Sequence, residues 1–480
     1  MANTVGNGEG RGTKDPFGAL YGFLMLGKLT RMLRSPKTQR AFRLRFAREA
    51  TLFFFMRISL VGLMFITSVM LTRKMGAAGF GVYVYATTVI NLLVVPAVFG
   101  LDQLLVREIS AHLHAQEWGR MRGLLGWTNR TSTLISLGLI LGTVAIVVVL
   151  SIFGRIDHEI LWSLLVALIM LPLVALTRLR QGTLRGLFRI VPSQLPETVI
   201  QPVLFLLFVF VWLFLAKARL NAVLVTGMHV FSTAVAFFVG SALLVHYLPK
   251  PIKTATSTYD LVAWRASAWP LLMYSSTQFL NRRIDTLLLG VLDGPESVGV
   301  YTAVVRSVDL LAFVLVAINS VLAPTIVTLY KSGNIKRLQR MCTTSARIAL
   351  LVTVIISIPL FMFGGLFLTI FGGDFAVGQS ALNVLSITKI FNAACGMQAL
   401  TLTMTGFEKD VVFGVGAGAL LNTLLNLLLI PGLGIMGAAI ASTSGMVCWN
   451  IILTVRVVQR LGLDTTVLGL FGRQRLASPL

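Results

Sequence analysis

Residues 274–309 read YSSTQFLNRRIDTLLLGVLDGPESVGVYTAVVRSVD, two apolar runs joined by a turn at Asp-Gly-Pro-Glu. The first run carries Arg282, Arg283 and Asp285, and the second carries Arg306 and Asp309. A charge at membrane depth is stable only beside a partner or in a water-filled cavity, so it indicates a functional site by default. Whether these runs cross a membrane therefore decides both the fold and the meaning of the charges.

The composition is that of a membrane protein. Apolar residues make up 56% of the chain, charged residues 12%, and mean hydropathy is +0.84, whereas soluble domains average about 25% charged. Lipid offers no hydrogen bonds to the backbone, and the apolar segments are too long for barrel strands, so we expect an all-α polytopic protein. The net charge of +23 would suggest nucleic acid in a soluble chain, but here we expect no nucleic-acid partner.

Twelve apolar segments are long enough to span a bilayer, which takes about 20 helical residues. We expect them at 51–72, 81–105, 128–152, 160–177, 198–216, 221–246, 268–291, 299–328, 345–371, 377–405, 410–430 and 435–456. The expected organisation is a basic N-terminal extension over 1–50, a six-helix lobe over 51–248, a linker over 249–261, a second six-helix lobe over 262–460 and a tail over 461–480.

The basic residues predict the orientation. With twelve crossings both termini lie on one side, and the termini with the loops of that side hold 31 of the 41 Lys and Arg, against five in the opposite loops. Positive loops remain in the cytoplasm, so we expect both termini to be cytoplasmic in a multi-pass membrane protein.

An internal repeat at an offset of 218 residues predicts two similar lobes. Seven of 23 positions are identical between 71–93 and 289–311, among them Gly76 with Gly294 and Gly-Val-Tyr at 81–83 with 299–301. A Phe-Gly pair at 153–154 recurs at 371–372, and a basic loop recurs with a slip of one residue. Six crossings per copy preserve orientation, so the repeats are parallel, and transporters bind substrate where such halves meet.

The hairpin at 71–110, its counterpart at 293–311 and the Pro324 segment leading into Gly333 carry a family resemblance over roughly residues 50–460. The chain resembles the polysaccharide transporters of the multidrug/oligosaccharidyl-lipid/polysaccharide exporter superfamily, the Wzx-type lipid-linked oligosaccharide flippases. The resemblance implies two lobes around a central cavity, alternating access, and undecaprenyl-pyrophosphate-linked sugars as the substrate.

The intramembrane charges are the candidate site residues. A guanidinium binds phosphate oxygens bidentately and stays charged when desolvated, so we expect pyrophosphate or acidic sugars at Arg57, Arg282, Arg283 and Arg306. Two carboxylates are candidates for orienting these arginines or binding a coupling ion, Asp285 and Asp309. The expected polar lining of the cavity is Asn91, Gln278, Asn281 and Lys389.

The spacing permits another interpretation of these charges. Arg282 with Asp285, and Arg306 with Asp309, stand three residues apart and could form structural ion pairs within their own helices. On the seventh helix Ser275, Gln278, Arg282 and Asp285 share one face, which we expect to line the cavity.

We therefore expect a flippase of lipid-linked oligosaccharide for surface polysaccharide such as exopolysaccharide or O-antigen, and not an enzyme. Its partners would be that substrate, membrane lipids and, as further candidates, polymerase and export proteins. No spacing for a metal or cofactor is present, and we expect none. The alternatives are a multidrug or organic-cation antiporter of the same superfamily, for which few intramembrane acids are available, and a scaffold or enzyme of polysaccharide assembly.

Overall fold

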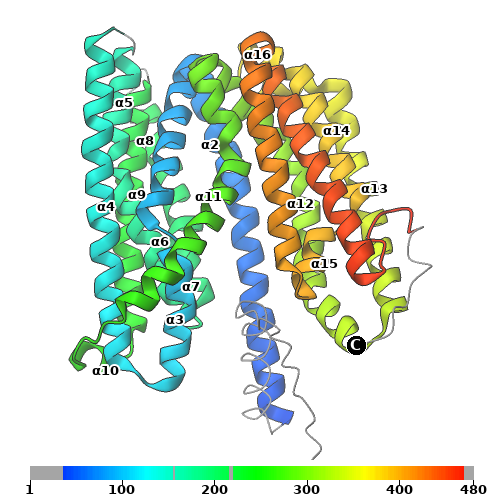
Figure 1. The fold of residues 1–480 in the computed structure, drawn as a ribbon. Coiled ribbons are helices and arrows are strands. Elements are labelled where there is room, and N and C mark those ends of the chain that lie inside the picture. The colour runs from blue at the N-terminus through cyan, green and yellow to red at the C-terminus, as the bar shows by residue number, and fades with distance from the viewer. Residues whose placement is uncertain (1–35, 155–156, 216–219, 470–480) are drawn as a thin grey trace, which may run out of the picture.

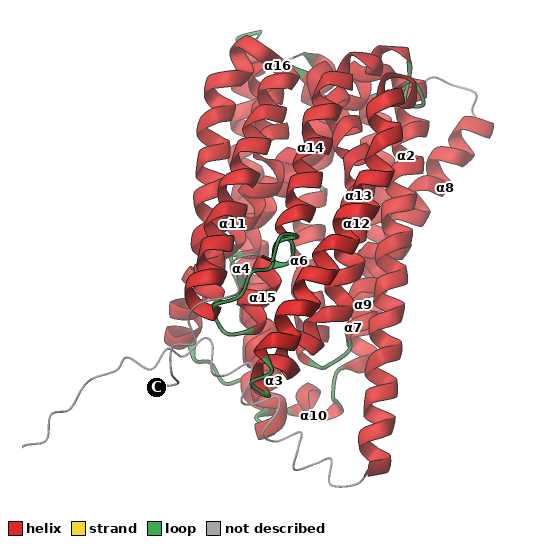
Figure 2. Ribbon diagram, turned by 90° about the vertical axis from the view of Figure 1, so that its right-hand side faces the viewer, coloured by secondary structure: helices red, strands yellow, loops and turns green. Residues whose placement is uncertain are grey.

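The computed structural model describes residues 36–154, 157–215 and 220–469. Within these ranges helices joined by loops make up the chain, and no strand is present (Figure 2). Seven of the described helices are long and apolar enough to cross a membrane, by length and composition. The expectation of an all-α polytopic membrane protein is confirmed.

The first half of the chain forms the left-hand group of helices in Figure 1 together with α2 at the centre. Its elements are α2 (Pro36–Val98), α3 (Leu101–Ala115), α4 (Trp118–Ile152), α5 (His158–Leu168), α6 (Met170–Gly186), α7 (Ile190–Leu195), the π-helix η1 (Pro196–Ile200), α8 (Gln201–Leu215), α9 (Ala222–Tyr247) and α10 (Lys250–Thr254).

The second half forms the right-hand group, with α11 leaning across toward the first. Its elements are α11 (Leu261–Leu292), α12 (Pro295–Lys331), α13 (Ile335–Leu368), the 3-10 helix η2 (Gly373–Gly378), α14 (Gln379–Cys395), α15 (Gln398–Met404) and α16 (Glu408–Leu461).

Two of the long helices contain a turn at a glycine. Gly76 in α2 has φ 71° and Gly434 in α16 has φ 50°, a conformation that L side chains rarely adopt. We count each side of these turns as one segment, join the second part of α2 with α3, α5 with α6, η1 with its neighbours and α14 with α15, and set the short α10 and η2 aside. The described chain then has twelve helical segments in two groups of six.

The helices extend beyond the spans that apolar length predicts. α2 begins at Pro36 rather than residue 51, and α6 continues to Gly186 rather than 177. The bilayer limits only the apolar part of a helix, because backbone hydrogen bonding continues equally well into the headgroup region. Pro196 is the first residue of the π-helix η1, and Pro202 lies just after it in α8.

The internal repeat is present in the backbone. Gly76 and Gly294, 218 residues apart, have φ of 71° and 95°, and Gly154 and Gly372, also 218 apart, have φ of 65° and 145°. The basic loops likewise turn through positive φ, at Gln116 and, with the slip of one residue, at Gly333. The two halves therefore place their turns at equivalent positions.

The repeats meet backbone to backbone at their Gly-Val-Tyr segments. A Cβ on Gly81 would lie 1.6 Å from the carbonyl oxygen of Pro295, and a Cβ on Gly299 would lie 2.2 Å from that of Ala77. Small residues allow helices to approach this closely. The contact joins α2 to α12 where the two groups come together near the top in Figure 1, while lower down the first part of α2 stands between them.

Candidate transport site between the lobes

A cavity of about 140 Å³ lies between the two halves of the chain. Its walls come from α2, η1, α8 and α9 of the first half and from a single residue of the second, Arg306 on α12. The polar residues that line it are Thr67, Tyr83, Glu197, Gln201, His229 and Arg306.

Arg306 reaches out of its own lobe. Its Nη1 donates a hydrogen bond of 2.8 Å to the carbonyl oxygen of Met64 in α2, and its guanidinium carbon lies 5.7 Å from the ring centroid of Phe80. These contacts use one of five N–H donors. Among the described residues no other hydrogen bond uses the remaining donors, so they can bind an anion in or beside the cavity.

The first lobe supplies a chain of hydrogen bonds behind the cavity. The Tyr83 hydroxyl lies 2.9 Å from Nδ1 of His229, and the other ring nitrogen lies 2.7 Å from Nε2 of Gln201, which also donates to Thr233. Phe205 stacks on the His229 ring with centroids 4.8 Å apart. Each member is held by two neighbours, so these side chains are preorganised.

Glu197 places a carboxylate in the same cavity. It follows Pro196 in the π-helix η1, and one of its oxygens accepts a hydrogen bond from Gln181. No ion pair joins Glu197 to Arg306 among the described side chains. The cavity therefore contains a separated acid and base rather than a closed pair.

Asp285 lies in a second polar cluster, inside the second lobe. Its carboxylate accepts hydrogen bonds from Asn422 and Asn426 of α16, each 2.8 Å long, from the Tyr301 hydroxyl at 3.1 Å, and from Ser442. The carboxylate is buried, and among the described residues no cation pairs with it. Buried charges are normally paired or bind an ion.

The repeat relates the two clusters. Tyr83 and Tyr301 occupy equivalent positions, yet the first bonds to a histidine of its lobe and the second to a carboxylate. The position equivalent to Asp285 is Thr67, which donates to the carbonyl oxygen of Leu63. The two lobes share a scaffold and differ in charge.

The ion pairs within single helices are absent from the described side chains. Asp285 bonds to α16 rather than to Arg282, and Asp309 lies 3.9 Å from the Lys389 amine of α14 rather than pairing with Arg306. The exposed Arg283 guanidinium is near enough to α12 to be attracted by the Asp309 carboxylate, and it repels the like charge of Arg306. Asp285 and Asp309 therefore contact residues on other helices, α16 and α14, rather than the arginines of their own helices.

The remaining candidates are more dispersed. Asn91 donates to the carbonyl oxygen of Thr87 within its own helix, and Arg282 is exposed on α11. We expected one face of α11 to line the cavity with Ser275, Gln278, Arg282 and Asp285. Two of these side chains have different surroundings, because Arg282 is exposed whereas Asp285 is buried inside the second lobe. The side chains of Arg57, Gln278 and Asn281 lie outside those that the structure describes.

Several polar residues of the two clusters were not expected from the sequence. Asn422 and Asn426 stand one turn apart in an otherwise apolar span, a pattern that could have identified them. Glu197 carried a weaker signal, because it lies between the expected spans at 160–177 and 198–216. Gln201 and His229 lie inside expected spans but carry no charge that would have marked them.

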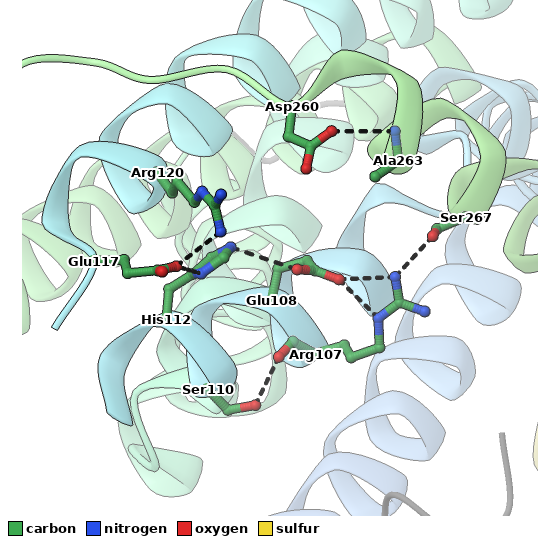
Figure 3. Close-up of polar contacts among 9 residues, drawn as sticks. All are labelled: Arg107, Glu108, Ser110, His112, Glu117, Arg120, Asp260, Ala263 and Ser267. Atoms are coloured by element: carbon green, nitrogen blue, oxygen red, sulfur yellow. Dashed lines mark hydrogen bonds and ion pairs between the residues drawn. The ribbon is translucent and has the colours of Figure 1, made fainter. Parts of the chain in front are cut away.

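A charged network lies at the lower end of the first lobe (Figure 3). Arg107 contacts Glu108 at 2.8 Å and donates to the Ser267 hydroxyl of α11 at 2.8 Å. His112 lies 3.4 Å from Glu108 and 2.7 Å from Glu117. The hydrogen bond from His112 lowers the pKa of the Glu117 carboxyl. Through Arg107 this network connects α3 to the first helix of the second lobe.

The chain has a two-lobed, all-α membrane fold, and solved structures of known proteins share this fold. An inward-facing multidrug resistance MATE family transporter of the MOP superfamily has a TM-score of 0.66 at 13% identity, over 85% of this chain and 98% of that one. The lipid II flippase MurJ in an inward closed conformation has a TM-score of 0.63 at 14% identity, over 85% and 86%. These likenesses concern the fold.

The sequence comparisons assign the family. The model of the polysaccharide biosynthesis protein family matches residues 46–330, and the MatE model matches 270–428. The probable flippase AglR of Haloferax volcanii is 25% identical over 215 residues, which span 43% of this chain and 43% of that relative. The chain belongs to the polysaccharide biosynthesis protein family.

Proposed function

We propose that the protein moves an undecaprenyl-pyrophosphate-linked oligosaccharide across the bacterial inner membrane for the export of a surface polysaccharide. The observation that carries this proposal is Arg306, a cation of the second lobe that lines a cavity walled by the first. Membership of the polysaccharide biosynthesis family supports it. The same family assignment and the two transporter-like lobes favour transport over enzyme chemistry.

Arg306 and Arg283 would receive the pyrophosphate. Arg306 holds its place through Met64 and Phe80 of α2 and retains donors for phosphate oxygens. Arg283 lies in the same electrostatic cluster. Arg57 and Arg282 are proposed as further contacts. Arg306 belongs to the second lobe and lines a cavity of the first. Rocking of one lobe against the other would therefore change the contacts between Arg306 and a bound anion, as alternating access requires.

The Asp285 cluster would bind the coupling ion. Its carboxylate has no cationic partner among the described residues, and Oδ1 of the neighbouring Asn426 is buried without a hydrogen-bond partner. A proton or a sodium ion at this position would satisfy both groups, since hard cations prefer carboxylate and amide oxygens. Asp309 would not bind the coupling ion. Its contact with Lys389 would determine how much negative charge lies near Arg283.

The membrane arrangement follows the distribution of basic residues. We propose that both termini are cytoplasmic, that residues 51–248 and 262–460 act as the two lobes, and that 249–261 links them on the cytoplasmic side. The cytoplasmic side corresponds to the lower end in Figure 1, where the basic loops gather. Lipid-linked oligosaccharide, membrane lipids and polysaccharide polymerase or export proteins are the proposed partners.

Transport by reconstituted protein tests the function. Liposomes that contain the protein and a fluorescent lipid-linked oligosaccharide should show transfer between leaflets that Arg306→Ala reduces by about tenfold or more, the effect of losing a charge-assisted hydrogen bond. Arg265→Ala, an exposed arginine elsewhere on α11, is the matched control. Wild-type transfer by Arg306→Ala would contradict the proposal.

Ion coupling has a separate test. Asp285→Asn keeps the size of the side chain and removes its charge, so it should abolish the response of transfer to a proton or sodium gradient. Binding of the substrate should persist. A gradient response that survives in Asp285→Asn would place the coupling ion elsewhere.

One observation favours the antiporter alternative. Glu197 places an acid in the cavity beside aromatic rings, a setting that suits an organic cation. Efflux of a fluorescent dye cation by the liposomes, lost in Glu197→Gln and unaffected by lipid-linked oligosaccharide, would support an antiporter instead.

A further inference from the structure

A basic groove lies at the lower end of the second lobe, away from the transport cavity. Its volume is about 560 Å³, and residues at the beginning of α13 line it, among them Lys336, Arg337, Arg340 and Thr344. The three cations are exposed, and no described carboxylate pairs with them. The groove therefore presents concentrated positive charge and a hydroxyl group at one end of a membrane helix.

The same face of α13 continues into apolar side chains. Arg337, Arg340 and Thr344 are followed at spacings of three and four residues by Ile348, Leu351 and Ile355, so all six lie within one narrow stripe. The apolar members are exposed by 52%, 63% and 58%. From Arg340 to Leu351 the helix rises about 16 Å, half of a ~30 Å hydrocarbon core. The stripe therefore has cations and a hydroxyl group at one end and an apolar surface that extends across one leaflet.

The equivalent basic loop of the first lobe is used differently. Arg120 pairs with Glu117 at 3.2 Å. Arg122 donates to the backbone carbonyl oxygens of Lys253 and Ala255 in the linker. The repeat therefore provides two copies of a basic turn, and in the first copy Arg120 and Arg122 are occupied by contacts within the chain. The second copy has no described carboxylate beside it.

We propose that this face of α13 binds an anionic phospholipid of the cytoplasmic leaflet. The phosphate would lie in the groove, held by Lys336, Arg337 and Arg340 with the Thr344 hydroxyl, and the acyl chains would lie along Ile348, Leu351 and Ile355. Charge complementarity and the continuity of the cations with the apolar stripe select a lipid rather than a free phosphate. The site stands apart from Arg306 and Asp285, so it goes beyond the proposed transport reaction.

Native mass spectrometry of the full-length protein in detergent tests the site, with phosphatidylglycerol and phosphatidylcholine as probes. We expect wild-type protein to retain phosphatidylglycerol preferentially, and Lys336→Gln/Arg337→Gln/Arg340→Gln to bind it about tenfold or more weakly. Binding of phosphatidylcholine should be equal in both proteins. The charge-preserving Arg337→Lys/Arg340→Lys should keep most of the preference, and similar thermal unfolding without lipid shows that a variant is folded.

A matched variant distinguishes a site from diffuse attraction. Lys250→Gln/Lys253→Gln/Arg265→Gln removes the same charge from exposed positions near the linker, and it should leave phosphatidylglycerol binding unchanged. An equal loss in this control, or wild-type binding by the groove variant, would overturn the proposal. Inorganic phosphate or undecaprenyl phosphate that occupies the groove when phosphatidylglycerol does not would also overturn it, in favour of a free anion or of the transported lipid.

Discussion

The close contact between the repeats makes a sharp prediction about Gly81. An alanine there would place its Cβ 1.6 Å from the carbonyl oxygen of Pro295, whereas ordinary contacts of this kind exceed 3 Å. α2 and α12 would have to separate by more than an ångström. Overpacking of this kind costs about 1–3 kcal/mol, and at roughly 2–4 °C per kcal/mol the unfolding temperature should fall by about 2–12 °C.

The measurement is thermal unfolding of purified protein in one detergent, followed by intrinsic fluorescence. Gly138→Ala in α4 is the matched control, because no atom lies within 4 Å of its Cβ position and alanine favours a helix. Gly299→Ala, 2.2 Å from the carbonyl oxygen of Ala77, should behave like Gly81→Ala. The double variant should cost less than the sum, since both changes break one contact. Equal stability of Gly81→Ala and Gly138→Ala would refute the packing argument.

Three further predictions concern charges. Asp285→Ala should lower the free energy of unfolding by about 1–3 kcal/mol, since it leaves the buried Asn422 amide without its acceptor, and Asp285→Asn should lower it less; unchanged thermal unfolding would refute a stabilising role for the cluster. Exchange of Asp309 and Lys389 should restore transport that either single reversal impairs, unless their 3.9 Å contact is incidental. Folding lowers the pKa of the Glu117 carboxyl, so Glu117 stabilises the folded protein above pH ~4.3, and this stabilisation is lost as pH falls further. Glu117→Gln should therefore reduce the loss of stability at acid pH, measured by thermal unfolding.

The sequence by itself determined the class, the number of crossings and the duplication. Apolar length and the absence of backbone partners in lipid allow only helices, so the spans follow from composition. The glycines at 76 and 294 were identifiable from the sequence, because a turn with positive φ needs glycine and the repeat preserves it. Arg306 and Asp285 were also identifiable, because charges are rare in such spans.

Only the tertiary structure decided what those charges touch. A spacing of three residues allowed Arg306 to pair with Asp309, but Arg306 crosses to α2 and Asp309 faces Lys389 of α14. Asp285 turns inward to α16, 137 residues away in sequence at Asn422. Periodicity predicts which residues share a face of one helix. It does not predict which helix packs against that face, and that choice separates the cavity from the buried cluster.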